Sequence, residues 1–207
     1  MINNLSKIRQ LLRFNKRNDF YFIQVLKRKK DNPGMTGDSQ CIKNFYAYSV
    51  AELDGMMPEI IELCCLHRAR AYIRLNVRNS EHVALCMLKD LADSIASGST
   101  QHLHRAWSSA CGKTNSDEKP LWIVDIDNPR EGDIEEVEAI IDEIWRFRNQ
   151  DGEFVQYIPT RNGLHIIVTP FDRKLFSEKL KHDVHTDNPT LLYIPDFPAI
   201  RENGIWA

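Results

Sequence analysis

Two separate segments constrain this chain most: an apolar stretch that ends in two carboxylates, and a turn followed by an apolar stretch with one histidine. They read Leu121-Trp-Ile-Val-Asp125-Ile-Asp127 and Tyr157-Ile-Pro-Thr-Arg-Asn-Gly-Leu-His165-Ile-Ile-Val168. Because side chains alternate along a strand, Asp125 and Asp127 should project from the same face. Neighbouring carboxylates repel unless a cation or protons neutralise them. Such oxygen ligands suit Mg²⁺ or Mn²⁺, which usually also bind substrate phosphates, so the pair indicates phosphoryl-transfer chemistry.

The composition is that of a folded protein with an uneven distribution of charge. The chain has 207 residues, of which 43% are hydrophobic and 27% are charged, and this is enough apolar surface for a core. Its formal net charge is −2, yet up to position 30 it holds one acidic residue, Asp19, against these basic ones: Lys7, Arg9, Arg13, Lys16, Arg17, Lys27, Arg28, Lys29 and Lys30. This asymmetry indicates a surface that faces a polyanion, although a solvated basic helix face has the same composition.

Cysteine use and hydropathy indicate the compartment. The five cysteines are neither even in number nor spaced like metal ligands, so we expect free thiols in a reducing cytoplasm. No apolar run approaches the ~20 residues that a membrane span requires, and the N-terminus lacks the apolar segment of a secretory signal. The sequence therefore predicts a cytoplasmic protein without a membrane partner.

The chain is predicted to form two modules that together make one compact core. Residues 1–98 form an N-terminal αβ module with the basic segment at its start, residues 99–119 form a polar linker, and residues 120–207 form the second module. Periodicity and capping signals predict these elements in the first module: strand 20–26, strand 43–48, a helix that follows Ser49 and is broken near Pro58, strand 69–77, and a helix capped by Ser80.

The second module is predicted to be an α+β unit, a mostly antiparallel sheet with helices on one face, close to an RRM-like module. Its elements are strand 121–127, a helix capped by Asp133, strands 154–158 and 164–169 joined by a turn, a short helix near 173–181 and a closing strand near 190–194. Asp125, Asp127 and His165 should stand on the uncovered face of this sheet. Leu164, Ile166 and Val168 would face the helices.

These segments resemble the motifs of the archaeo-eukaryotic primase superfamily, which contains primases, primase-polymerases and the polymerase domains of bacterial end-joining ligases. Val124-Asp-Ile-Asp127 is similar to the family's apolar strand ending in Asp-x-Asp, and Thr160-Arg-Asn-Gly-Leu-His165 to its turn and histidine. Asp183-Val-His-Thr-Asp-Asn188 resembles the family's later acidic stretch. The family usually has an apolar residue before that aspartate, whereas His182 stands here, so Asp187 and Asp196 remain alternatives.

The resemblance implies template-dependent nucleotidyl transfer with two divalent ions, Mg²⁺ or Mn²⁺, held by Asp125, Asp127 and Asp183. It also implies that His165 contacts the phosphates of an NTP or dNTP, beside the turn formed by Thr160, Arg161, Asn162 and Gly163. Charge and position make the following residues candidates for contact with nucleic acid: Arg74, Arg78, Lys27, Arg28, Lys29 and Lys30. The implied partners are single-stranded DNA or a primer-template and a separate helicase, in the replication of a phage, plasmid or mobile element.

Two other function classes remain open. The uncertain third acidic position is compatible with a catalytically inactive module that binds nucleic acid. The same carboxylates could also serve a metal-dependent nuclease or phosphoesterase, which would hydrolyse DNA or RNA without a triphosphate.

Overall fold

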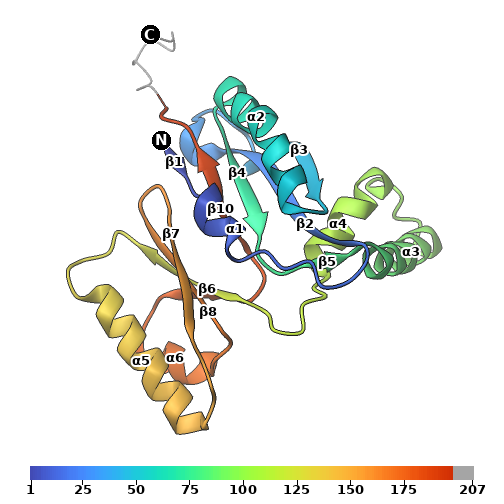
Figure 1. Ribbon diagram of the computed structural model, residues 1–207. Coiled ribbons are helices and arrows are strands. Elements are labelled where there is room, and N and C mark those ends of the chain that lie inside the picture. The colour runs from blue at the N-terminus through green and yellow to red at the C-terminus, as the bar shows by residue number, and fades with distance from the viewer. Residues whose placement is uncertain (198–207) are drawn as a thin grey trace.

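Two antiparallel β-sheets with helices packed around them form the protein, as the computed structural model shows for residues 1–197 (Figure 1). The first sheet has the order β1-β10-β4-β2-β3, and β5 pairs with the start of β2. Its strands are β1 (Ile2–Asn3), β2 (Asp19–Arg28), β3 (Ser39–Ala47), β4 (Ala69–Arg74), β5 (Arg78–Asn79) and β10 (Pro189–Ile194). The second sheet has the order β7-β8-β6-β9, with β6 (Trp122–Asp127), β7 (Phe154–Pro159), β8 (Gly163–Val168) and β9 (Asp183–His185). The predicted α+β class is confirmed.

The helices differ in length and in the surface that they cover. They are α1 (Leu5–Arg9), α2 (Val50–His67), α3 (Ser80–Ala96), α4 (Ala106–Lys113), α5 (Asp133–Arg148) and α6 (Arg173–Lys179), with 3₁₀ turns η1 (Lys29–Asp31) and η2 (Leu103–Arg105). Among residues 1–197, no helix combines the length and the apolar character needed to cross a membrane.

Helix α2 covers one face of the first sheet and begins with a capping box. The Ser49 hydroxyl accepts the Glu52 N–H at 3.1 Å, and the Glu52 carboxylate accepts the Tyr48 N–H at 2.9 Å. The helix runs unbroken through Pro58, so the predicted break is wrong. The reason is tertiary: the residues buried on either side of Pro58, Met57 and Ile60, belong to one core with the first sheet.

Helices α3 and α4 cover part of the opposite face of the first sheet, where Phe20 and Phe22 are buried. Helix α4 lies inside the segment 99–119 that the sequence predicts as a linker, and its Ala110 and Cys111 are buried in this cluster. The cap of α3 is Asn79, whose side chain accepts the Glu81 N–H at 3.1 Å, rather than the predicted Ser80. Helix α5 likewise begins after Gly132, and the predicted cap Asp133 is its first residue.

The second sheet buries one face against α5 and α6. Val124 and Ile126 of β6 pack with Val137 and Ile141 of α5, since every second residue of the strand points to this face. Ile166 and Val168 of β8 are buried in the same cluster and Leu164 packs against it, as predicted. The alternation therefore directs Asp125, Asp127 and His165 to the other face.

That other face is not uncovered along its whole length, which corrects the prediction. Ile123, Ile158 and Ile167 belong to the core of the first sheet. Strand β10, predicted to close the second module, instead pairs with β4 and β1, and the short β9 takes the place beside β6. The first sheet thus closes over the apolar end of this face, and the carboxylates remain at the open end.

Candidate functional site

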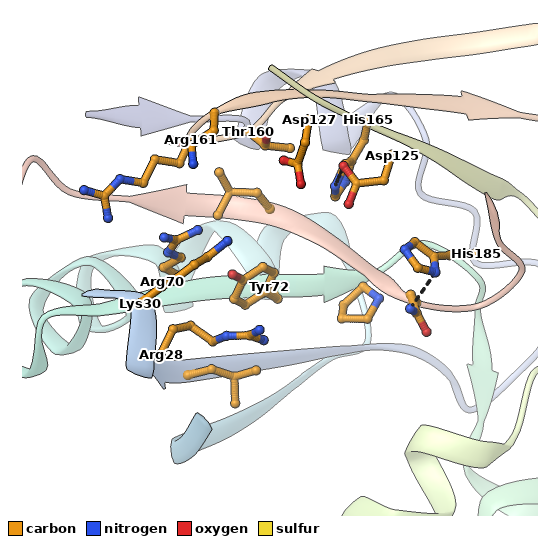
Figure 2. Close-up of a pocket in the computed structure, with 15 residues that line it drawn as sticks. Arg28, Lys30, Arg70, Tyr72, Asp125, Asp127, Thr160, Arg161, His165 and His185 are labelled. Atoms are coloured by element: carbon orange, nitrogen blue, oxygen red, sulfur yellow. Dashed lines mark hydrogen bonds and ion pairs between the residues drawn. The ribbon is translucent and has the colours of Figure 1, made fainter. Parts of the chain in front are cut away.

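A pocket of about 250 Å³ lies between the two sheets, at the end of β6 that carries the carboxylates (Figure 2). From the second sheet and its loops come Asp125, Asp127, Thr160, Arg161, Asn162, His165, His185 and Asn188. From the first sheet and η1 come Leu26, Arg28, Lys30, Arg70, Tyr72, Pro189 and Leu191. Each sheet contributes one wall, so the pocket exists only where the two modules meet.

Strand register arranges the acidic end of the pocket. Asp125 lies directly opposite His165 on β8 and opposite Asp183 on β9, and residues opposed in this way share a face. Asp127 lies opposite Gly163. A Cβ atom on Gly163 would collide with the carbonyl oxygen of Ile126, so glycine allows the turn to approach β6 closely beside Asp127.

His165 is held by two partners. Its Nδ1 atom is 2.8 Å from the hydroxyl of the buried Thr190 on β10, and its Nε2 atom is 3.4 Å from Oδ1 of Asp125. An ionised carboxylate can only accept, so in the neutral ring Nε2 carries the proton and Nδ1 accepts from the Thr190 hydroxyl. A residue of the first sheet therefore orients a histidine of the second sheet.

Asp125 is kept ionised by its surroundings. The hydrogen bond from His165 lowers the pKa of its carboxyl below the ordinary value, and the charges of His185 and Lys30 act in the same direction. Partial burial opposes this shift but does not reverse it. An ionised carboxylate on an accessible pocket wall is available as a ligand for a cation.

The opposite end of the pocket is basic. Arg28, Lys30, Arg70 and Arg161 line it, and Asp31 lies buried behind them. The guanidinium of Arg70 binds the Asp31 carboxylate through Nε at 2.6 Å and through Nη2 at 2.8 Å, and Arg161 pairs with the same carboxylate. Burial and the neighbouring charges of Arg70 and Arg28 lower the pKa of Lys30. The cations are thus close enough to repel one another.

The candidates for a third acidic residue lie outside this pocket. Asp183 shares the face of Asp125 by register, but it is exposed and does not line the cavity. Asp187 pairs with Arg78 and lies 3.6 Å from a guanidinium nitrogen of Arg74. Asp196 is exposed and pairs with the N-terminal amine of Met1.

Of the residues predicted to contact nucleic acid, some line the pocket and others lie outside it. Arg28 and Lys30 line the pocket, whereas Lys29 is exposed outside it and Lys27 lines a different hollow with Arg68 and Phe197. The side chain of Arg78 is 0% exposed, and it binds the carbonyl oxygens of Asn76 and Cys111 as well as Asp187. Arg74 is mostly buried in the same network. A template strand has no access to Arg78.

Four polar pocket residues are not among the residues predicted for the site: Arg70, Tyr72, His185 and Asn188. A signal existed for two of them, because the alternation Ala69-Arg-Ala-Tyr-Ile-Arg74 places Arg70, Tyr72 and Arg74 on one face of β4. The roles of Thr190 and Asp31 had no local signal, since each depends on a partner far away in the chain.

The donor set supports a simple cation site rather than a closed metal cage. Within residues 1–197, no three His, Cys, Asp or Glu side chains are grouped so that they could hold a metal ion. Asp125 and Asp127 by themselves fit one hard cation, because Mg²⁺ is commonly bound through one or two carboxylates with waters and substrate phosphates completing the shell. The function of this pocket has to be inferred from its residues alone, because no family model, curated protein or solved structure matches the chain.

Proposed function

We propose that this protein is a template-dependent nucleotidyltransferase of the DNA primase–polymerase type, which uses Mg²⁺ or Mn²⁺ and an NTP or dNTP. One observation carries the proposal: a single pocket presents two carboxylates, Asp125 and Asp127, across from a cluster of cations, with His165 beside the carboxylates. A cation site facing an anion site is what a metal-bound triphosphate requires.

The order of elements supports an RRM-like catalytic module. The segment runs β6-α5-β7-β8-α6-β9, and its strands lie in the order β7-β8-β6-β9. This is a β-α-β-β-α-β unit in which the first strand lies between the third and the fourth. The carboxylates stand on the central strand of that unit, where neighbouring strands fix their direction from both sides.

Asp125 and Asp127 would hold the divalent cation, which, when bound, would activate the attacking 3′-hydroxyl and neutralise charge on the α-phosphate. The lowered pKa of Asp125 keeps its carboxylate ready for this role at neutral pH. His165, whose Nδ1 atom is fixed by Thr190, directs its Nε2 N–H toward Asp125, and this N–H would turn to a phosphate oxygen when the Asp125 carboxylate binds the cation. Single-stranded DNA or a primer-template would approach from the open side of the pocket, during replication of a mobile element or phage.

The test is primer synthesis and primer extension on single-stranded DNA with Mn²⁺, using NTPs and dNTPs in separate reactions. The variant Asp125→Asn/Asp127→Asn removes both carboxylate charges while keeping side-chain size, and we expect it to abolish incorporation. Glu135→Gln/Glu136→Gln removes two charges from the exposed side of α5 and serves as the matched control. Equal activity of the two double variants would refute the assignment of the site.

A second candidate function is a nucleic-acid-binding module without catalytic activity, and the exposed position of Asp183 outside the pocket favours it. Such a module would bind single-stranded DNA without a divalent cation, with an affinity that falls steeply as salt increases. Binding of this kind together with no incorporation of any nucleotide would select it over the polymerase. Cleavage of DNA in the absence of triphosphate would instead indicate a hydrolase.

A further inference from the structure

The basic end of the pocket carries more positive charge than its own residues neutralise. Arg28, Lys30, Arg70 and Arg161 line it, and among residues 1–197 the one carboxylate in direct contact with them is that of Asp31. Asp127 also acts on Lys30, but only through the electrostatic field. In addition, the Nε atom of Arg28 is buried and has no hydrogen-bond partner among the described residues. Clustered like charges are costly unless an anion neutralises them, and an unsatisfied buried donor adds to that cost.

Asp31 is the organising residue of this end. Its side chain is 0% exposed, and that of Arg70 is 4% exposed, so their two-point contact is a buried ion pair. Arg161, from the turn between β7 and β8, reaches the same carboxylate from the other module. One carboxylate therefore fixes two guanidinium groups that belong to different modules, and both line the pocket.

We propose that this basic end binds the phosphate oxyanions of the incoming nucleoside triphosphate, and that Asp31 is the positioning residue that holds Arg70 and Arg161 for it. The proposal rests on the function proposed above and names the part of the substrate that the first module recognises. Arg28 and Lys30 contact the anion directly.

The shape of the pocket favours a triphosphate over a nucleic-acid backbone. A backbone needs a groove that continues past several nucleotides. The cavity is small, at about 250 Å³, and its cations are gathered at one end, with the carboxylates at the other. A compact polyanion fits this arrangement, because it can touch the cations while a bound cation links it to Asp125 and Asp127.

The first experiment measures binding of inorganic tripolyphosphate to the complete chain by calorimetry, without divalent cations. We expect Lys30→Ala to weaken binding about tenfold or more, the loss expected for one charge-assisted hydrogen bond. Lys89→Ala removes the same charge from an exposed position on α3, outside the pocket, and should change binding less than about twofold. Equal affinities of the two variants would overturn the proposal. The proposal would also be overturned by a Lys30→Ala protein that loses affinity for a single-stranded oligonucleotide without a terminal phosphate but keeps its affinity for tripolyphosphate.

The second experiment tests Asp31 through the split between KM and kcat. Asp31→Asn keeps the shape and the acceptor oxygen but loses the charge, so we expect the KM for the triphosphate to rise more than kcat falls. A purely structural role would reduce the amount of folded enzyme without changing KM, and a thermal melt of each preparation measures that amount. A folded Asp31→Asn protein with an unchanged KM would contradict the positioning role.

The two proposals fail in different ways. If tripolyphosphate binding depends on Lys30 but the protein does not extend primers, the anion site is supported and the polymerase function is refuted. If Lys30→Ala and the unmodified protein extend primers with the same KM for the triphosphate, the polymerase function is supported and the anion site is refuted.

Discussion

Replacing Gly163 with alanine should push β8 away from β6 at the point where Asp127 stands. An added Cβ atom would overlap the carbonyl oxygen of Ile126, and it would lie 3.0 Å from the carbonyl carbon of Ile126 and 3.1 Å from Cα of Asp127. All three are backbone atoms, so no side-chain rotation can make room. The strands themselves have to separate.

The size of the effect follows from these contacts. The tightest overlap is with the Ile126 oxygen, and Cβ atoms essentially never come within 3.0 Å of another heavy atom, so the strands must separate by at least about 1 Å to accept the methyl group. Overpacking of this kind costs about 1–3 kcal/mol, and we expect the free energy of unfolding to fall by an amount near the top of that range. Primer extension should fall at least about tenfold, because a misplacement of about 1 Å in a catalytic site can reduce the rate about 10²-fold.

The assay is urea unfolding followed by tryptophan fluorescence, combined with primer extension at saturating triphosphate. Gly55→Ala is the matched control, because Gly55 lies in α2 and a Cβ atom there meets nothing within 4 Å. That variant should be more stable by about 0.5–1 kcal/mol and equally active. If Gly163→Ala behaves like Gly55→Ala, the close approach of the turn to β6 is not what positions Asp127.

Two further predictions concern the histidine and its carboxylate. Thr190→Val keeps the shape of a buried side chain but leaves Nδ1 of His165 without its partner. The free energy of unfolding should therefore fall by about 1–3 kcal/mol, and primer extension should fall with it. Full activity of this variant would show that Thr190 does not orient the ring. The pKa of Asp125 is lower in the folded protein than in the unfolded chain, so its ionisation stabilises the fold above the ordinary carboxyl pKa, and this contribution disappears as the pH falls through the lowered value. Urea unfolding should therefore show the metal-free protein to be more stable than Asp125→Asn at pH 6, and this difference should shrink below about pH 4. A difference in stability that stays constant with pH would contradict the cause given for the pKa shift.

The acidic end of the site could be predicted because its signals are local. Alternation within 121–127 places Asp125 and Asp127 together, and the turn before Leu164 places His165 on the neighbouring strand. Each of these statements depends on a few adjacent residues and on the two-residue repeat of a strand. The structure accordingly brings all three side chains to one pocket wall.

The basic end could not be predicted in the same way, because its parts come from distant positions. Arg70 becomes a pocket residue only because β4 turns this face toward the second sheet. Asp31 lies in a three-residue 3₁₀ turn, and its partner Arg161 is on the other module. The sequence predicts β10 in the second sheet because its apolar run fits either sheet, whereas its place is decided by pairing with β4. Local patterns do not contain this information.

Several contacts show that the two modules hold the site as one unit. The Asn4 side chain donates to the carbonyl oxygens of Pro159 and Leu191 at 2.9 Å each, and so joins β7 to β10. The Asn76 side chain accepts the Leu121 N–H at 2.6 Å and donates to the carbonyl oxygen of Thr186 at 3.2 Å. It thus holds the residue just before β6 and the segment just before β10. Because these bonds bracket the strands that carry the carboxylates and the histidine, the geometry of the acidic end depends on the first module as much as on the second. The same docking brings the cations of the first sheet opposite Asp125 and Asp127, so a pocket with both ends can form only after the long-range pairing is complete.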